Sequence, residues 1–385
     1  MSKKKLKKKK NKRSPKTVII TVIIIIVIAA LAAGGLVLFF KYRSFSGYDI
    51  KSSVDVSTSS ETISLTEYSD GYILCAGDAI TYFTDDGVVW SESLEITQPI
   101  VDVCGDYAAV GDMEGSDVYI YDNSGLAGHV TTEYSLLDIE VSEAGVVAMA
   151  TNSSSSNYIE LKDREGNELV TAKSIFSSSG YLIDIALSDD GTGLAAAFLY
   201  TADGALESKI LFYDFSGDSD SDDVLVGGFN QYTDTLITSV KYMKDDVVCA
   251  IGDNAITFYD FSGTPEIISE ELDLEWEIHS LYANDDYILL VASDTSGSAT
   301  YTGYVYNNSG ALAAAVSLET IYNNAVLAER NILLYSSSDC SMYSFDGQLK
   351  FSCSFEESVD CMLSCGSRNR LLYIASGNAN FIKLR

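Results

Sequence analysis

A repeating unit of short apolar runs constrains the fold of this chain more than any other feature of its sequence. In each unit a strongly apolar run follows an acidic or glycine turn. These runs begin at Tyr72, Tyr107, Val146, Leu194, Val247, Tyr287, Asn331 and Leu371. Their spacing ranges from 35 residues (Tyr72 to Tyr107) to 53 residues (Leu194 to Val247). A spacing of ~40–50 residues is typical of four-stranded propeller blades, so the repeat predicts an all-β propeller.

A second recurring element supports the same fold. A later run in each unit ends in a tight polar turn, as in residues 80–87 (ITYFTDDG), 118–125 (VYIYDNSG), 256–263 (ITFYDFSG) and 303–310 (GYVYNNSG). Asp, Asn and Gly are favoured there because they adopt positive φ at low cost. No long stretch of helical periodicity follows residue 47, which is typical of an all-β domain.

The eight apolar runs predict eight blades, with seven as the alternative count. The last unit is one strand short, because only Arg385 follows its third strand, residues 380–384 (NFIKL). A sheet without its outer strand has an unpaired edge, which proteins avoid. Residues 48–56 (YDIKSSVDV) roughly alternate apolar and polar side chains, so we expect them to complete blade eight. Residues 62–68 (TISLTEY) are then the inner strand of blade one.

The units resemble quinoprotein-type (PQQ-like) and WD-type propeller repeats. Residues 82–90 (YFTDDGVVW) are similar to the strand, Asp-x-x-Gly turn and Trp of the quinoprotein pattern. Residues 182–191 (LIDIALSDDG) resemble the inner strand and turn of many bacterial propellers. The whole layout resembles uncharacterised membrane-anchored propeller proteins of Gram-positive bacteria. The chain has no adjacent cysteine pair of the kind that quinone-dependent dehydrogenases use, so the resemblance implies the fold without the quinone cofactor.

The first 40 residues differ in character from the repeats. Residues 1–16 contain ten basic residues and no acid, and residues 17–40 are 24 residues without a charge. At ~1.5 Å per residue, a helix of this length crosses a ~30 Å hydrocarbon core. We therefore expect a single-pass protein of the cell membrane: a cytoplasmic tail (1–16), a transmembrane helix (17–40), a linker (41–47) and an extracytoplasmic propeller (48–385). A signal peptide cleaved near Ala32 is the alternative.

The charge of the chain excludes one class of partner. The formal net charge is −30, with 55 acidic and 25 basic residues. Twelve of the basic residues precede position 44, so 13 basic residues face all 55 acids in the rest of the chain. Such a polyanion repels nucleic acid, because binding to nucleic acid requires cations that neutralise phosphates. We expect no nucleic-acid partner.

The sequence contains few residues of the types that commonly catalyse reactions or bind metal ions. The two histidines, His129 and His279, are expected to be structural, because they cannot build a zinc site or a Ser-His-Asp triad alone. Alternating aspartates in residues 218–223 (DSDSDD) could bind Ca²⁺, but the Gly and Glu of an EF-hand are absent. A solvated acidic loop is the preferred interpretation. We predict no catalytic, cofactor-binding or metal-binding residue and no cofactor.

Seven cysteines leave at least one thiol unpaired. Cys75, Cys104 and Cys249 lie in apolar runs, where cysteine behaves as a small buried side chain. Cys340 and Cys353 could face each other across a hairpin, with or without a disulfide between them.

The turns of a propeller divide into two faces. The first and third turns of each blade share one face, where this sequence places many acidic residues. The second turns and the connections between blades share the other. Longer loops on that second face contain tyrosines that could contact a ligand or could be half-buried strand residues: Tyr134, Tyr181, Tyr200, Tyr232 and Tyr301.

We expect a non-enzymatic binding or scaffold module outside the cytoplasmic membrane. Its longer loops would bind a protein or a cell-wall polymer. The alternative is a glycan-acting hydrolase or lyase that uses carboxylates in the central funnel. That alternative requires acids that converge in the funnel with unmatched charge.

Overall fold

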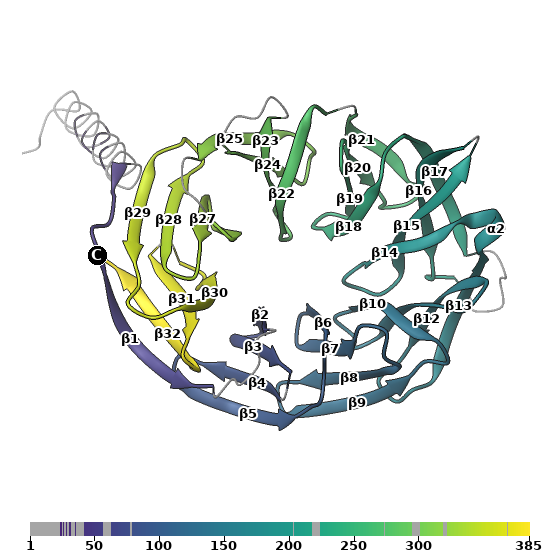
Figure 1. Cartoon of the computed structure of the whole chain (residues 1–385), viewed down its shortest axis with the longest axis horizontal. Coiled ribbons are helices and arrows are strands. Elements are labelled where there is room, and N and C mark those ends of the chain that lie inside the picture. The colour runs from purple at the N-terminus through teal and green to yellow at the C-terminus, as the bar shows by residue number, and fades with distance from the viewer. Residues whose placement is uncertain are drawn as a thin grey trace, which may run out of the picture. The chain divides into compact units, whose positions relative to one another are not determined.

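The computed structural model describes residues 42–56, 63–77, 79–202, 204–217, 224–272, 274–294, 301–318, 322–367 and 369–385, together with Ile24, Ile26, Ile28, Leu31 and Gly35. The chain divides into two compact units, Met1–Phe45 and Ser46–Arg385. The second unit is a ring of four-stranded sheets (Figure 1).

Eight antiparallel sheets make up this ring, which confirms the prediction of an all-β, eight-bladed propeller. The alternative count of seven blades is wrong. We call the strands of each blade A to D, from the central axis outward. In seven blades these strands follow one another along the chain, and the eighth takes its D strand from the N-terminal side.

The strands of blades one to four have the following bounds. Blade one contains β2 (Ile63–Tyr68), β3 (Gly71–Ala76), β4 (Ala79–Thr84) and β5 (Gly87–Ser93). Blade two contains β6 (Pro99–Cys104), β7 (Tyr107–Asp112), β8 (Asp117–Asp122) and β9 (Gly125–Thr131). Blade three contains β10 (Ser135–Val141), β11 (Val147–Asn152), β12 (Ser156–Lys162) and β13 (Glu168–Ile175). The short helix α2 (Phe176–Ser179) leads to blade four, which contains β14 (Tyr181–Leu187), β15 (Gly193–Ala202), β16 (Ala205–Asp214) and β17 (Leu225–Thr233).

The remaining blades follow the same order. Blade five contains β18 (Ile237–Met243), β19 (Val247–Gly252), β20 (Ile256–Asp260) and β21 (Glu266–Glu271). Blade six contains β22 (Trp276–Ala283), β23 (Tyr287–Asp294), β24 (Tyr301–Asn307) and β25 (Leu312–Leu318). Blade seven contains β26 (Asn324–Ala328), β27 (Asn331–Tyr335), β28 (Asp339–Ser344) and β29 (Leu349–Ser354). Blade eight contains β30 (Val359–Ser364), β31 (Arg370–Ala375), β32 (Asn378–Leu384) and β1 (Tyr48–Asp55).

Strand β1 closes the ring. It pairs antiparallel with β32, from Tyr48 opposite Leu384 to Asp55 opposite Asn378. This confirms the prediction that the segment beginning at Tyr48 completes blade eight. Figure 1 shows β1 beside β32 at the outer edge of the ring. The described part of the predicted inner strand 62–68 is β2.

The hydrophobic core consists of the contacts between neighbouring blades. The B strands are the most apolar segments, and β3 and β19 are buried along their whole length. One core cluster joins Ile73 of blade one to Val110 of blade two, and another joins Leu289 of blade six to Ile332 of blade seven. The outer strands alternate exposed and partly buried residues, as in β13. The strong B-strand signal in the sequence therefore comes from burial on both faces of each sheet.

Residues 17–40, predicted to form a transmembrane helix, lie outside the described residues except for Ile24, Ile26, Ile28, Leu31 and Gly35. Within the described part of the chain, no helix has the length and apolar character needed to cross a membrane.

A ladder of aspartates ties four inner strands together. Asp102 in β6 accepts a hydrogen bond from the backbone amide of Val141 at 2.7 Å. Asp138 in β10 accepts one from Ile185 at 3.3 Å, and Asp184 in β14 accepts one from Val240 at 2.7 Å. The last two aspartates directly follow a register shift in their strands. Such bulges redirect a side chain, which here reaches the next blade.

We expect Asp184→Ala to destabilise the propeller by about 1–3 kcal/mol, because it leaves the buried amide of Val240 without an acceptor. Asp184→Asn removes the same charge but keeps an acceptor oxygen, so its loss should be clearly smaller. The free energy of unfolding in denaturant measures both. Equal losses in the two variants would show that the hydrogen bond contributes nothing.

Candidate functional site

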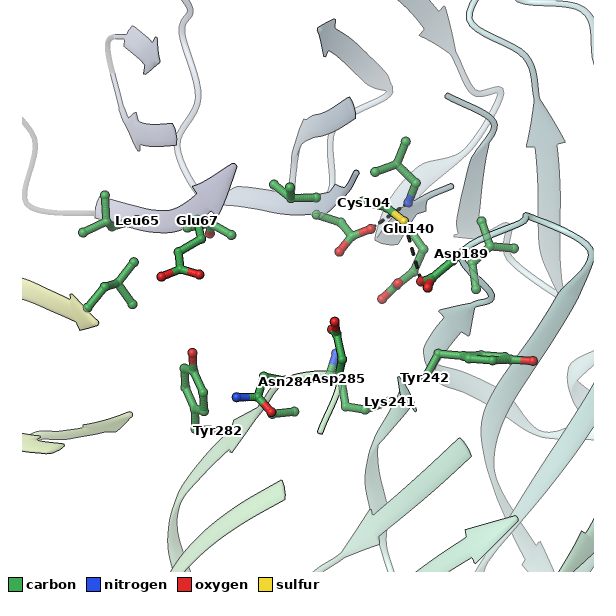
Figure 2. A pocket seen from close by; sticks show the side chains of 17 residues that line it. Leu65, Glu67, Cys104, Glu140, Asp189, Lys241, Tyr242, Tyr282, Asn284 and Asp285 are labelled. Carbon is green, nitrogen blue, oxygen red and sulfur yellow. Dashed lines mark hydrogen bonds between the residues drawn. The ribbon is translucent and has the colours of Figure 1, made fainter. Parts of the chain in front are cut away.

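The C-terminal ends of the A strands surround a cavity of about 390 Å³. Its walls come from blades one to six and from blade eight, together with the A–B turns of blades four and six. Glu67, Asp102, Glu140, Asp189 and Asp285 line the cavity, and Lys241 is the one basic residue among the lining residues. Figure 2 shows Glu67, Glu140 and Asp189 on one side of this space and Lys241, Tyr282 and Asn284 on the other.

These charged groups differ in the number of hydrogen bonds and ion pairs that they form with neighbouring residues. Asp102 is held by the amide of Val141, and Asp189 accepts a hydrogen bond from the Cys104 thiol at 3.7 Å. Asp285 forms an ion pair with Lys244 at 3.7 Å. Glu67 and Glu140, by contrast, make no hydrogen bond and no ion pair with any described residue. Both can therefore accept a hydrogen bond from a ligand, although the charge of Glu140 also acts on Lys241.

Burial dominates the electrostatics of the cavity. It raises the pKa of Glu67, and burial together with the charge of Asp102 raises the pKa of Glu140 well above its usual range. Burial also raises the pKa of Asp102, although the amides of Val141 and Val103 oppose the shift.

The pKa of Lys241 is also raised, but for a lysine a raised pKa favours the charged form. Burial lowers its pKa, but Glu140, Asp184, Asp138 and Asp102 outweigh burial and raise it. Lys241 is therefore a permanent cation at neutral pH, and it is not a nucleophilic amine. Carboxyl groups therefore outnumber the one fixed positive charge in the cavity.

Two further cavities open on the same face of the ring. One, of about 500 Å³, lies at the turns of blades two and three and is lined by Asp106, Asp122 and Glu143. The other, of about 180 Å³, lies between blades four and five and is lined by Asp190, Asp214 and Asp246. Several of these acids bond within their own turns: Asp122 accepts from the amide of Ser124, and Asp214 from that of Ser216. Turn geometry thus explains their positions, but their negative charge remains on this face.

The tyrosines predicted to lie in loops of the opposite face do not form one surface. Tyr232 is completely buried at the end of β17, where its hydroxyl bonds that of Tyr259, so of the two interpretations the strand residue is correct at this position. Tyr134 stacks on Tyr158 with ring centres 4.8 Å apart, and Tyr301 contacts Tyr322. Tyr181 is exposed. The segment around Tyr200 is a hairpin of long strands rather than a loop.

Neither histidine lies at the three cavities. His129 in β9 stacks on Tyr119 and lies 2.8 Å from Asp117. His279 in β22 lies 2.8 Å from the hydroxyl of Ser293. In the described part of the chain, no group of three or more His, Cys, Asp or Glu residues is arranged to hold a metal ion. The acidic segment 218–223, considered above for Ca²⁺, lies outside the described residues.

The cysteines follow their predicted burial with one exception. Cys75 and Cys249 are buried, as expected for apolar runs. Cys104 is only partly buried and lines the central cavity, where burial and the nearby Asp189 raise its pKa. The prediction of a small buried side chain at this position is therefore wrong. Its A strand faces the cavity, unlike the B strands that hold Cys75 and Cys249.

Sequence reasoning considered carboxylates in a central funnel but did not identify the residues that line the cavity. Glu67, Glu140 and Lys241 are far apart in the chain and lie in otherwise ordinary alternating strands. A signal was present: an aspartate recurs within the apolar inner strands at residues 100–103 (IVDV), 136–139 (LLDI) and 182–185 (LIDI). A charged residue repeated at a blade's spacing indicates a position that faces the central axis.

A model of the protein family described as "Family of unknown function (DUF5711)" matches residues 41–384. The chain belongs to this family. The match covers β1 to β32, and therefore every blade together with the strand that closes the ring. None of the curated proteins compared with the chain matches it.

Solved structures with a similar backbone are also propellers. Sqt1 from Chaetomium thermophilum is 13% identical with a TM-score of 0.55; the alignment covers 88% of this chain and 98% of that one. Sqt1 from Saccharomyces cerevisiae is 12% identical with a TM-score of 0.52, covering 89% and 99%. The WD40 domain of Pan2 from Neurospora crassa is 12% identical with a TM-score of 0.45, covering 74% and 88%. At these identities the similarity to the two Sqt1 structures establishes a shared fold and nothing about the ligand.

Proposed function

We propose that this protein is a membrane-anchored, extracytoplasmic binding module whose acidic propeller face holds a positively charged partner. The partner is a basic protein segment or a cell-wall polymer that carries amino groups. The observation that carries the proposal is the central cavity, where Glu67 and Glu140 accept no hydrogen bond from a described residue. Glu140 is partly buried and has already lost part of its hydration, so a ligand cation that pairs with it meets a smaller further desolvation cost, whereas Glu67 is exposed.

The remaining charge of the chain supports the same partner chemistry. All three cavities described above open on the A–B and C–D turn face, and acids line each of them. A surface of one sign attracts oppositely charged partners and speeds their encounter. This face differs from the longer loops that the sequence favoured as the binding surface.

The anchor belongs to the proposal as well. Residues 17–40 carry no charge, and the described residues Ile24, Ile26, Ile28 and Leu31 are helical with more than half of each side chain exposed. The backbone of Ser46 bonds that of Arg385 at 2.9 Å, so the chain enters the propeller on the acidic face.

The same cavity also supports one feature of the alternative, a glycan-acting hydrolase or lyase. The pKa of Glu140 is raised by burial and by Asp102, as a general acid requires. The ladder aspartates Asp102, Asp138 and Asp184, however, are engaged with backbone amides. A second free carboxylate for this chemistry would have to be Glu67, which comes from blade one, two blades away from Glu140.

A binding measurement with the full chain in detergent tests the proposal. We expect a fluorescent oligolysine peptide to bind, and Glu67→Gln with Glu140→Gln to weaken its Kd by about tenfold, which corresponds to ~1.4 kcal/mol. The control is Glu133→Gln, compared with Glu67→Gln and Glu140→Gln as single variants, because it removes the same single charge from a connection on the opposite face. It should leave the Kd nearly unchanged.

Two results would contradict the binding module. Equal weakening by Glu133→Gln would show that only net charge attracts the peptide. New reducing ends in purified cell-wall glycan that accumulate with the protein and disappear with Glu140→Gln would instead establish the hydrolase.

A further inference from the structure

Blade seven holds two cysteines directly opposite each other. Cys340 in β28 is the register partner of Cys353 in β29, and their sulfur atoms are 3.4 Å apart. Both thiols are free. All seven cysteines are among the described residues, and no other two of them are hydrogen-bonded to each other.

The register of the two strands places these cysteines at a separation that suits a disulfide. Directly opposed residues of antiparallel strands have Cα atoms about 4.5–5.5 Å apart, which falls within the ~4.4–6.8 Å of natural disulfides. The sulfurs are 3.4 Å apart against ~2.05 Å for the bond, so they must approach by about 1.4 Å. Small rotations of the two side chains can supply this movement without a shift of the strands.

The two thiols are unequal in exposure and in acidity. Cys340 is buried, whereas Cys353 on the outermost strand is partly exposed. The hydrogen bond from Cys340 lowers the pKa of the Cys353 thiol, and the same contact together with burial raises that of Cys340. Cys353 is therefore the accessible thiol that ionises first, and Cys340 is placed to resolve an intermediate formed on it.

We propose that Cys340 and Cys353 form a reversible disulfide across the two outer strands of blade seven, made by exchange with a disulfide oxidant. The Cys353 thiolate attacks the oxidant, and the new S–S bond forms as the oxidant's own S–S bond breaks and releases one thiol. The sulfur of Cys340 then gives up its proton, attacks Cys353 and releases the second thiol. The protein loses two electrons and two protons, and the oxidant gains them.

This disulfide would lie beside the seam that closes the ring. Tyr48, near the start of β1, contacts Phe351 with ring centres 6.4 Å apart and Phe355 with ring centres 6.0 Å apart. Phe351 is part of β29, the strand that carries Cys353. A covalent link between β28 and β29 would hold Phe351 in place against Tyr48 of the closing strand. Loss of this link under reducing conditions would weaken the contact between β29 and β1.

Mass spectrometry of the full chain after incubation with oxidised and reduced glutathione tests the proposal. We expect a cross-linked peptide pair containing Cys340 and Cys353, and a fall in titratable thiols of the denatured chain from seven to five. The unfolding midpoint should rise on oxidation and return on reduction. Absence of the Cys340–Cys353 link at glutathione ratios that oxidise ordinary protein thiols would overturn the proposal.

Two variants make the result specific. Cys353→Ser should abolish the link and the rise in midpoint. Cys361→Ser, which changes a partly buried cysteine whose register partner is Ile374, should leave both intact. A link that forms equally well through Cys361 or Cys365 would contradict the assignment to blade seven.

Discussion

Val54→Asp is expected to open the propeller at its seam and to lower the free energy of unfolding by more than about 3 kcal/mol. Val54 lies in β1 with 8% of its surface exposed and packs in a cluster with Leu372 and Phe381 of blade eight. A carboxylate at this position would be buried without a partner, which is among the most destabilising changes that a single residue can make. Strand β32 would then lose its only outer neighbour and expose an edge that favours aggregation.

A control substitution on the same strand separates the cost of burying a charge from the effect of adding a charge to the surface. Ile50 is also in β1, but 52% of its surface is exposed, so Ile50→Asp should cost no more than about 0.5 kcal/mol. Denaturant unfolding gives both energies, and limited proteolysis with peptide mapping reports on cleavage in β32. If the two variants unfold at the same denaturant concentration, β1 is not the strand that holds the ring closed.

A second large effect concerns pH. The propeller should be more stable near pH 5 than near pH 8, and Glu140→Gln should stabilise it at pH 8 by about 1 kcal/mol or more. Burial and Asp102 raise the pKa of Glu140 above its ordinary value of 4.5, so the folded protein binds this proton more tightly than the unfolded chain. Its contribution is therefore complete below about pH 4.5 and is lost as pH rises through the folded-state pKa.

Burial also raises the pKa values of Glu67, Asp102 and Asp138, so only the comparison with Glu140→Gln isolates the contribution of Glu140. Hydrogen bonds from Asn167 and Ser262 lower the pKa values of Asp163 and Asp260, which lose their stabilising charge only at lower pH. The measurement is the thermal unfolding midpoint against pH for the wild type and for Glu140→Gln. The general repulsion among acids affects both proteins, so the variant should show a shallower dependence. Parallel curves would mean that Glu140 is ionised to the same extent in the folded and unfolded states.

The fold was predictable from the sequence because its strongest signal is local. Each B strand is buried between two neighbouring blades, so it appears as an uninterrupted apolar run, and eight such runs gave the correct blade count. The closing strand was predictable by elimination, since the last unit lacked a partner and residues 48–56 had the right alternation.

The cavity was not predictable in this way, because it depends on residues brought together only by ring closure. Glu67, Glu140 and Lys241 come from blades one, three and five. Nothing in their local sequence distinguishes them from solvated strand residues. The sequence likewise allows two interpretations of Tyr232, and only the structure shows that β17 continues to Thr233 and turns this side chain into the core.

The pairing of β1 with β32 has a consequence for how the chain reaches its final form. Ser53 and Asn380, which are hydrogen-bonded across this seam, are 327 residues apart in the sequence. Most other strands pair with the strand that immediately precedes or follows them, so individual blades can assemble while the chain is still being synthesised. The ring itself cannot close until β32 has emerged, and β1 must wait unpaired throughout that time. We expect closure to be the slowest step of folding, and the interval before it to be the period in which the chain most needs protection from association with its own copies.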